Sequence, residues 1–326
     1  MTKNIIITGG AGFIGLHLTK SLLKKGYKLF VIDNLSRGKF DNEFKEIIKN
    51  KKVNFLKINL GKKIPINFKN IDLIFHLAGS VGVKNITDKP YNSFLNNVSS
   101  LKNIISLNKK LKKEAKIILF STSEVYSPLI ASGKVKYPIK ESSEIFLNSE
   151  TSKRDAYYLS KIFNEKLVEL SCKNYLILRP HNIYGPRMGY SHVIPELIKK
   201  MYYEKINRTK STIVYSPTHK RAFCYIDDAV SQIIKLSLNR NIKNEVFNIG
   251  NMDEEIKIIE LAKIIKKLYF KKSKINLGPI TQGSPERRVP NMKKTKSKTK
   301  IFTNTNLKEG VKKTLNWYIS DLKKRK

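Results

Sequence analysis

The sequence predicts an α/β fold, in which a doubly wound parallel sheet precedes a smaller mixed α/β C-terminal domain. Three observations support this. The chain opens with a short strand, a glycine-rich turn and a helix, and almost wholly apolar strands then alternate with amphipathic helices. Beyond Pro180 that alternation breaks down. Continuous apolar strands are buried on both faces, so helices must cover both sides of the sheet. With 326 residues the chain is long enough to bury such a core.

The glycine-rich turn lies within the first fifteen residues. Asn4–Thr8 is a β-branched run, and Gly9, Gly12 and Gly15 follow at three-residue spacing. One glycine lets the chain turn off the strand, one lets the backbone approach a pyrophosphate, and one lets the helix pack on the sheet. The phosphates then lie at the helix N-terminus. We therefore predict a Rossmann dinucleotide site, with a glycine turn that binds no ligand as the alternative.

An acidic residue follows the second predicted strand. Residues 28–32 form this strand and Asp33 ends it, about 20 residues beyond the glycines, where a carboxylate accepts hydrogen bonds from an adenosine ribose. A carboxylate also repels a 2′-phosphate, so NAD is favoured over NADP, although Arg37 nearby could weaken that preference.

The remaining elements follow from apolar periodicity and from Gly and Pro breakers. In the first part we expect strands at 53–58, 72–77, 116–121 and 175–178, helices at 13–25, 41–50, 90–107 and 156–172, and a loop at 122–155. In the second part we expect a loop at 179–188, strands at 213–215, 222–226 and 246–249, and helices at 193–203, 227–238, 258–269 and 307–323. The first domain should span residues 1–185, with 226–250 returning to it, and the second 186–326. Such sheets bind ligands at the carboxyl ends of their strands.

The charge is unusual, because 64 Lys and Arg against 26 Asp and Glu leave a net charge of +38. Such a balance raises nucleic acid or an anionic membrane as partners. The lysines are scattered, however, and no basic run is interleaved with aromatic residues for base stacking. We expect no specific nucleic-acid partner, and interpret the densest run, residues 293–300, as a mobile surface segment that binds polyanions weakly at most. Nucleic-acid binding remains an alternative.

The cysteines and the beginning of the sequence indicate in which cellular compartment we expect the protein. Cys172 and Cys224 lie in separate segments without metal-ligand spacing, so we predict no metal site and a reducing compartment. The first strand begins almost at Met1, and no apolar run approaches the ~20 residues of a membrane span. We expect a soluble, cytoplasmic protein with no membrane partner.

Two groups of residues suggest catalysis. Tyr157 and Lys161 are four residues apart, so they share one helix face. An ammonium and an oxidised nicotinamide both favour a phenolate, so Tyr157 could act as a base. At the end of the fifth strand, the hydroxyl of Thr122 or Ser123 could bond the same substrate oxygen, and Glu124 adds a carboxylate. The alternatives are an ordinary surface pair and a strand-end cap.

Taken together, the motifs GGAGFIG, HLAG, STSEVY, YYLSK, RPHNIYGP and RAFCYIDD, with Asp33, occur in a characteristic order. In this the chain resembles the extended short-chain dehydrogenase/reductases that modify nucleotide sugars, which include epimerases, 4,6-dehydratases and UDP-glucuronate decarboxylase. The resemblance covers essentially the whole chain. It implies a Rossmann domain that holds NAD, a nucleotide-sugar-binding domain at 186–326, and a homodimer built on a helix bundle.

The resemblance also implies roles for individual residues. Tyr157 is the expected base, Lys161 its partner and Thr122 the assisting hydroxyl. Asn182 and Arg221 are expected ligands of the sugar diphosphate, a task that suits the planar guanidinium. Arg287 or Arg288 is expected to help; the sequence alone does not rank these neighbours, and we name Arg288 as the site residue. The expected cofactor contacts are Gly9, Gly12, Phe13, Ile14, Gly15, Asp33, Asn34, Asn59, Leu60, Leu77, Ala78, Tyr157 and Lys161.

The chain departs from the family pattern at several positions. Asn59 stands where the family often has an acid near the adenine, and Gly79 replaces a more usual alanine. The loop before Tyr157 carries its own acids, so substrate contacts there stay unassigned; these acids are Glu141, Glu144 and Glu150. We interpret His76 as a structural residue at the sheet end rather than as an acid or base.

The shared first step of the family is oxidation of the sugar at C-4. The outcome then depends on whether the 4-ketone is rotated and reduced, loses water or loses a C-6 carboxylate. The Thr-Ser-Glu sequence resembles the decarboxylases and some dehydratases, while Ser123 replaces the aspartic acid of the glucose dehydratases. We predict an NAD-dependent nucleotide-sugar epimerase/dehydratase. The alternatives are a UDP-glucuronate decarboxylase-type enzyme that forms UDP-xylose, and a catalytically idle NAD-binding sensor or scaffold.

Overall fold

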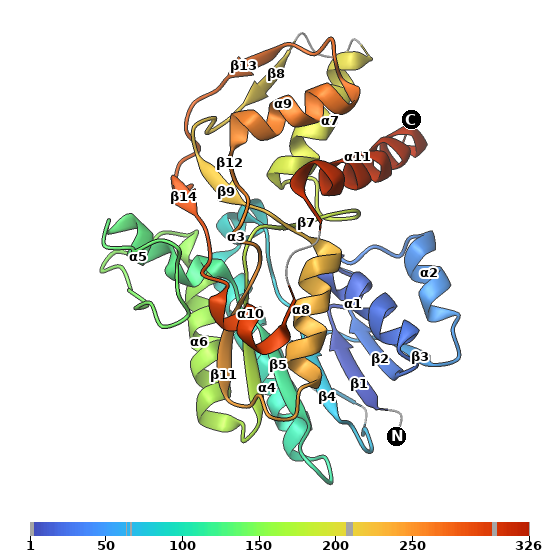
Figure 1. Cartoon of the computed structure of the whole chain (residues 1–326). Helices are drawn as coiled ribbons and strands as arrows, with labels where there is room; N and C mark the ends of the chain where they lie inside the picture. The colour runs from blue at the N-terminus through green and yellow to red at the C-terminus, as the bar shows by residue number, and fades with distance from the viewer. Residues whose placement is uncertain (1–2, 63, 66, 207–210, 302–304, 326) are drawn as a thin grey trace. The chain divides into compact units, whose positions relative to one another are not determined.

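The computed structural model describes residues 3–62, 64–65, 67–206, 211–301 and 305–325. These residues form two compact units, each of which is drawn from several stretches of the chain (Figure 1). Unit 1 contains the residues up to Pro128, Glu144–Pro180 and Val230–Phe247. Unit 2 contains Leu129–Ser143, His181–Ala229 and the residues from Asn248 onward. The chain therefore passes between the units more than once.

Unit 1 is built on a seven-stranded parallel sheet, which confirms the predicted fold class. The strand order is β11-β6-β5-β4-β1-β2-β3. The strands are β1 (Asn4–Thr8), β2 (Lys28–Asp33), β3 (Val53–Lys57), β4 (Leu73–His76), β5 (Lys116–Phe120), β6 (Tyr175–Pro180) and β11 (Glu245–Ile249). On one side β1 pairs with β2, with Ile6 opposite Phe30, and on the other with β4, with Ile6 opposite Ile74. The strand order reverses at β1, where such sheets bind their ligands.

Helices flank this sheet and place the functional segments at its strand ends (Figure 1). They are α1 (Phe13–Lys24), α2 (Asn42–Ile48), α3 (Val83–Asp88), α4 (Pro90–Lys109), the 3₁₀ turn η1 (Ser123–Tyr126), α6 (Asp155–Ser171) and α8 (Ile226–Leu238). The side chain of Asp41 accepts a hydrogen bond from the backbone of Phe44 at 3.0 Å and begins α2. The two long helices α4 and α6 pack against each other.

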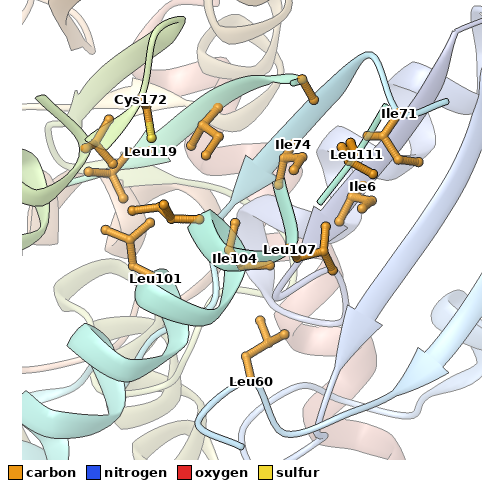
Figure 2. Close-up of a cluster of buried hydrophobic side chains, with 14 of the residues drawn as sticks. Ile6, Leu60, Ile71, Ile74, Leu101, Ile104, Leu107, Leu111, Leu119 and Cys172 are labelled. Carbon is orange, nitrogen blue, oxygen red and sulfur yellow. The ribbon is translucent and has the colours of Figure 1, made fainter. Parts of the chain in front are cut away.

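The core of unit 1 explains why its strands are continuously apolar. All five residues of β5 are buried, and Ile117 and Leu119 belong to one core cluster with residues of α4. Figure 2 shows Leu119 in this cluster with Ile104 and Leu107. The intervening Ile118 is also fully buried although it lies outside that cluster. Because successive side chains of a strand point to opposite faces, both faces of the sheet are covered.

Unit 2 has smaller sheets and several helices. Its elements are β7 (Ile183–Tyr184), α7 (Val193–Lys205), β8 (Thr212–Val214), β9 (Lys220–Ala222), β10 (Cys224–Tyr225), β12 (Glu255–Lys257), α9 (Ile258–Tyr269), β13 (Ile275–Leu277), β14 (Arg287–Arg288), α10 (Lys293–Thr299) and α11 (Leu307–Lys324). The sheets have the orders β10-β7, β12-β9-β14 and β13-β8. The short helix α5 (Ser127–Ala131) leads into this unit.

Some predicted elements differ from the structure. The expected loop at 122–155 contains η1 and α5, and the expected strand at 222–226 is divided, because β9 ends at Ala222 and β10 begins at Cys224. The expected loop at 179–188 includes the end of β6 and all of β7. Strands of two or three residues are too short to show periodicity, so neighbouring chain segments decide them.

The interpretation of residues 293–300 as a mobile surface segment was wrong. Most of this basic run forms α10, and Thr295 and Thr299 are buried on its inner face. The Thr295 hydroxyl donates to the Asn248 carbonyl at 2.6 Å, and the Lys296 ammonium pairs with Asp253 at 2.6 Å. The threonines recur at a spacing of four between the lysines, so one face of the run packs while the other is solvated.

The other sequence expectations concern cysteines and membrane spans. Cys172 and Cys224 are both buried free thiols. Within the part of the chain that the structure describes, every helix is too short or too polar to cross a membrane.

Candidate active site

The glycine-rich turn between β1 and α1 shows a different constraint at each glycine. Gly9 has φ +70°, and a Cβ there would lie 2.9 Å from the backbone nitrogen of Ala78. A Cβ on Gly15 would lie 2.2 Å from the Gly9 carbonyl oxygen. At Gly12, by contrast, the only described atom within 4 Å of such a Cβ is the Gly9 carbonyl oxygen at 3.1 Å. Gly9 and Gly15 are therefore fixed by close backbone packing, whereas Gly12 leaves room beside the chain.

The space beside Gly12 adjoins the N-terminus of α1. Phe13 and Ile14 begin this helix, whose first N–H groups have no carbonyl partner within the helix. These N–H groups and the helix dipole favour a bound anion. The turn thus fits the pyrophosphate of a dinucleotide, since it offers both space and donors.

Asp33 lies next to this turn and organises it. Its Oδ2 accepts a hydrogen bond from the Ala11 nitrogen at 3.0 Å, and its Oδ1 accepts one from the Leu35 nitrogen at 2.8 Å. The residue is 8% exposed. A carboxylate oxygen can accept more than one hydrogen bond, so these two contacts are compatible with Asp33 also accepting one from a ribose hydroxyl. Next to it, the Asn34 side chain accepts from the Ser36 nitrogen at 3.0 Å.

The other expected cofactor contacts lie at the ends of β3 and β4. Asn59 is exposed, and its side chain accepts a hydrogen bond from the Gly61 nitrogen at 3.0 Å. Leu60 points its side chain into the core cluster, where it is 5% exposed, so only its backbone remains for a ligand (Figure 2). Leu77 and Ala78 are half-buried where the chain leaves β4.

His76 at the end of β4 is held in a structural arrangement. Its Nδ1 lies 3.0 Å from the Thr8 hydroxyl oxygen, which in turn accepts a hydrogen bond from the Ala78 nitrogen at 3.1 Å. Burial, together with the positive charge of the nearby Lys161, lowers the pKa of His76 to about 3. The imidazole is therefore neutral at physiological pH and poorly suited to proton transfer, which agrees with the structural role that we expected for it.

Lys161 and Tyr157 lie on one face of α6, as their spacing predicts. The Lys161 ammonium donates to the Phe120 carbonyl at 2.8 Å and lies 5.9 Å from the centroid of the Tyr157 ring. Lys161 is 4% exposed, whereas Tyr157 is half-buried. Burial lowers the pKa of Lys161 to about 8, and the Glu165 carboxylate opposes that shift. A cation is thus held beside the phenol ring at the carboxyl end of β5.

The hydroxyl segment lies at the same end of β5. The Thr122 hydroxyl oxygen accepts a hydrogen bond from the Glu124 nitrogen at 3.2 Å and caps η1. It therefore is a strand-end cap, but its own hydroxyl proton is still available for a second partner. Ser123 is buried and Glu124 is half-buried in η1, against which α6 packs.

Arg37 reaches the loop after β4. One of its guanidinium nitrogens donates to the Val81 carbonyl, and the phenol of Tyr157 lies within electrostatic range. The Arg37 guanidinium is therefore a second cation near the Tyr157 ring. From the sequence we had related Arg37 only to the ribose end of the cofactor.

Asn97 of α4 is a residue that sequence reasoning missed. Its Oδ1 accepts a hydrogen bond from the Ser80 nitrogen at 2.6 Å, and its Nδ2 donates to the Ser160 hydroxyl at 2.9 Å. A Cβ on Gly79 would lie 3.0 Å from Asn97 Oδ1 and 3.6 Å from Lys161 Nζ. Gly79 therefore leaves room for both side chains. The available signal was a polar residue on the buried face of a helix.

The expected diphosphate ligands gather in unit 2. The Asn182 amide donates to the carbonyls of Ala222 at 3.1 Å and Arg288 at 3.4 Å. The Arg221 guanidinium donates to the Ser284 hydroxyl at 2.9 Å and to the carbonyls of Pro285 at 2.7 Å and Glu286 at 3.1 Å, among others. Arg221 and Arg288 are opposite each other on the paired strands β9 and β14, and Asn182, between β6 and β7, is bonded to both strands, so the structure brings the three residues together.

The two adjacent arginines differ in their surroundings. Arg287 forms two 2.8 Å hydrogen bonds with the Glu255 carboxylate. Arg288, by contrast, lies within electrostatic range of Arg221. Burial of Arg221 and the positive charge of Arg288 together lower the pKa of Arg221 to about 10. A buried guanidinium next to a second cation favours an anionic ligand. Of the loop acids, Glu141 accepts a hydrogen bond from the Asn248 nitrogen at 2.9 Å.

Comparison with known proteins identifies the family. Residues 5–250 match the family model described as the NAD dependent epimerase/dehydratase family, and the chain belongs to this family. It is 31% identical to UDP-N-acetyl-alpha-D-glucosaminuronate decarboxylase of Bacillus cytotoxicus, with 98% of each chain covered. It is also 31% identical to a putative UDP-glucose 4-epimerase of Methanocaldococcus jannaschii, over 96% of this chain and 97% of that one.

Among solved structures, the chain is similar to UDP-glucuronic acid 4-epimerase from Bacillus cereus in complex with UDP-glucuronic acid and NAD. The TM-score is 0.78 at 25% identity, over 97% of this chain and 99% of that one. The predicted class, an NAD-dependent enzyme of the epimerase/dehydratase family with a Rossmann fold, is thereby confirmed. The roles of the individual residues stay predictions.

The two glycines of the turn give a first prediction. Gly15→Ala should lose NAD binding and lower the melting temperature, because the new methyl group meets backbone at 2.2 Å. Gly12→Ala should also lose NAD binding but lower the melting temperature of the cofactor-free protein much less than Gly15→Ala, because its methyl group would lie 3.1 Å from the Gly9 carbonyl oxygen rather than 2.2 Å. NAD titration and thermal unfolding measure both effects. Full NAD affinity in Gly12→Ala would contradict the assignment.

Lys161 gives a prediction on pH. Its pKa is about 8 in the folded chain against an ordinary value of 10.5, so the unfolded chain holds the proton more tightly. Stability should therefore rise with pH between about 8 and 10.5, by up to about 3 kcal/mol. Lys161→Met removes this pH-dependent contribution to stability. Its melting temperature relative to the parent should therefore fall as the pH rises from about 8 to 10.5. The exposed Lys166→Met should show no such trend, and a pH-independent difference for Lys161→Met would contradict the burial of a charge.

Proposed function

We propose that the chain oxidises C-4 of a nucleotide sugar to a 4-ketone, as an NAD-dependent nucleotide-sugar epimerase/dehydratase. The observation that carries this proposal is the buried Lys161 ammonium, 5.9 Å from the centroid of the Tyr157 ring, at the carboxyl end of β5. Thr122 follows that strand directly. The family match and the space beside Gly12 support NAD as the cofactor.

Each residue has a separate task in this scheme. Tyr157, as a phenolate, takes the proton of the C-4 hydroxyl, and the charges of Lys161 and Arg37 lower the electrostatic cost of that phenolate. Thr122 donates its hydroxyl proton to the same sugar oxygen, while the Glu124 nitrogen occupies its acceptor side. The glycine-rich turn and Asp33 would hold NAD, which when bound would supply the hydride acceptor for C-4 and the hydride for the product. Asn182, Arg221 and Arg288 hold the diphosphate.

A second candidate is a UDP-glucuronate decarboxylase-type enzyme that forms UDP-xylose. The Thr-Ser-Glu sequence supports it, as does the Bacillus cytotoxicus relative, whose name is that of a decarboxylase. In this case the C-4 ketone promotes loss of the C-6 carboxylate as carbon dioxide, and C-5 is then protonated. Glu124 is the half-buried carboxylate nearest in sequence to Thr122 and would act at this later step.

Mass spectrometry of products from a panel of UDP-, dTDP-, GDP- and CDP-sugars, with UDP-glucuronic acid among them, separates these branches. An unchanged mass with a changed configuration indicates epimerisation, loss of water a dehydratase, and loss of carbon dioxide a decarboxylase. We expect one nucleotide class to react. If no sugar reacts, the protein is an NAD-binding sensor or scaffold.

Tyr157→Phe is the matched control for this experiment. It should lower turnover by at least about a hundredfold, since general base catalysis contributes roughly 10²–10⁴. NAD content should be unchanged, because the ring is retained. Turnover equal to that of the parent would refute the proposed base.

We also propose that the protein is a homodimer built on α4 and α6. These helices pack together in unit 1 and expose large apolar side chains, namely Tyr91 and Leu95 on α4 and Phe163 and Leu170 on α6. Apolar patches of this kind commonly mark protein interfaces, and a second copy would bring the same four side chains.

Sedimentation velocity tests the dimer. The Phe163→Glu/Leu170→Glu double variant should sediment as a monomer, because it places charges in the interface. Leu277→Glu is the matched control, since Leu277 is an exposed leucine on β13 in unit 2. Dissociation by the control alone, or a dimer in the double variant, would contradict the proposal.

A further inference from the structure

A buried ion pair lies behind Lys161 in unit 1. Arg179 of β6 donates from Nε to Glu165 Oε1 at 3.0 Å and from Nη2 to Glu165 Oε2 at 2.6 Å. Glu165, on α6, is 1% exposed and Arg179 is 4% exposed. The pair is thus bidentate and nearly dry, the geometry in which a guanidinium fixes a carboxylate most firmly.

The same pair binds both ends of the segment that carries Thr122. The Ser121 hydroxyl, one residue before Thr122, donates to Glu165 Oε1. Arg179 Nη1 donates to the hydroxyl of Tyr126, the last residue of η1, at 2.7 Å, and the guanidinium lies 5.0 Å from the ring centroid. Both Ser121 and Tyr126 are buried. The turn from Thr122 to Val125 is therefore held at either end by one ion pair.

Glu165 also acts on the lysine. It lies one helical turn beyond Lys161, on the face that Lys161 shares with Tyr157. Its carboxylate raises the pKa of Lys161 against the effect of burial. The other titratable groups near Lys161 are Tyr157 on α6 and His76 on β4, with Arg37 facing Tyr157. Among the described groups whose effect on Lys161 is resolved, Glu165 is the acid that keeps it charged.

Stability alone is a weak reason for such a pair. Taking two charges out of water is costly, and well-packed apolar residues of similar volume are often as stable or more so. A buried pair that also binds Ser121 and Tyr126 fixes orientation, which an apolar pair could not do. The geometry therefore points to a role in placing neighbouring groups.

We propose that Glu165 and Arg179 are positioning residues, which hold the Thr122 hydroxyl in place relative to Tyr157 and keep Lys161 protonated. This inference rests on the proposed function. It makes two separable claims. The hydrogen bond from the Ser121 hydroxyl to Glu165 fixes the position of Thr122, and the negative charge of Glu165 stabilises the protonated form of Lys161.

The first arm uses the sugar that the panel identifies. Glu165→Gln removes the charge but keeps an acceptor, and it should move the alkaline limb of the kcat profile to lower pH by about one unit, the lower end of the effect of a close charge. Ser121→Ala removes only the hydroxyl, and it should lower kcat roughly tenfold, equivalent to one hydrogen bond, with KM and the alkaline limb unchanged. Glu169→Gln is the matched control, because Glu169 is on the same helix in an exposed pair with Lys166.

The second arm needs no substrate. The melting-temperature difference between Lys161→Met and its parent is followed against pH in the parent and in the Glu165→Gln background, with NAD content measured in each. We expect the midpoint of this difference at lower pH in the Glu165→Gln background. Identical midpoints would overturn the charge claim, and unchanged kcat in Ser121→Ala would overturn the positional claim, even if Glu165→Gln does not fold.

The two arms separate this inference from the proposed function. A shifted midpoint with no reacting sugar would support the coupling of Glu165 to Lys161 while the proposed function fails. A reacting sugar with both readouts unchanged would leave the proposed function intact and overturn the inference.

Discussion

The burial of the Lys161 ammonium is the constraint on which the candidate site depends. An isolated charge in the interior is costly, and it persists only when hydrogen bonds and opposite charge offset that cost. The Phe120 carbonyl and the Glu165 carboxylate supply these, and both belong to elements that pack tightly in unit 1. Because the offset is incomplete, the pKa of Lys161 falls to about 8. The group thus remains a cation near neutral pH, where it can favour a phenolate in Tyr157.

The parallel sheet explains why this lysine and the glycine-rich turn belong to the same edge of the sheet in unit 1. In such a sheet all strands end at one edge, and the strand order reverses at β1. The glycine turn follows β1, Asp33 ends β2, and Thr122 follows β5, so all three lie at the same edge of the sheet. Nothing in the sequence around one of them indicates that the other two are there. Gly9 and Gly79 each allow a close approach there, Gly9 to the Ala78 backbone and Gly79 to Asn97 and Lys161.

Much of unit 1 could be predicted because its elements carry long, regular signals. The apolar run of β5, the glycine spacing and the four-residue spacing of Tyr157 and Lys161 each reflect local geometry. Unit 2 carries weaker signals, and α10 was missed because only two buried threonines distinguish it from a solvated lysine run. The contacts of Glu165 with Arg179 and Ser121 could not be predicted, because they join three elements whose register only the folded sheet defines.

Family membership leaves the final reaction open for a physical reason. The C-4 step uses Tyr157, Lys161 and Thr122 in every branch of the proposed scheme, so the residues that define the family cannot distinguish the branches. The difference must arise near C-5 and C-6 of the sugar. In this chain the backbone nitrogen of Glu124 donates to the Thr122 hydroxyl oxygen, so Thr122, Ser123 and Glu124 lie in one capped turn. Substitution at 123 or 124 leaves the Thr122 cap in place, since the cap uses only the backbone nitrogen of residue 124, so in the proposed scheme the side chains at 123 and 124 can differ between branches. The ion pair that holds this turn at Ser121 and Tyr126 serves every branch alike.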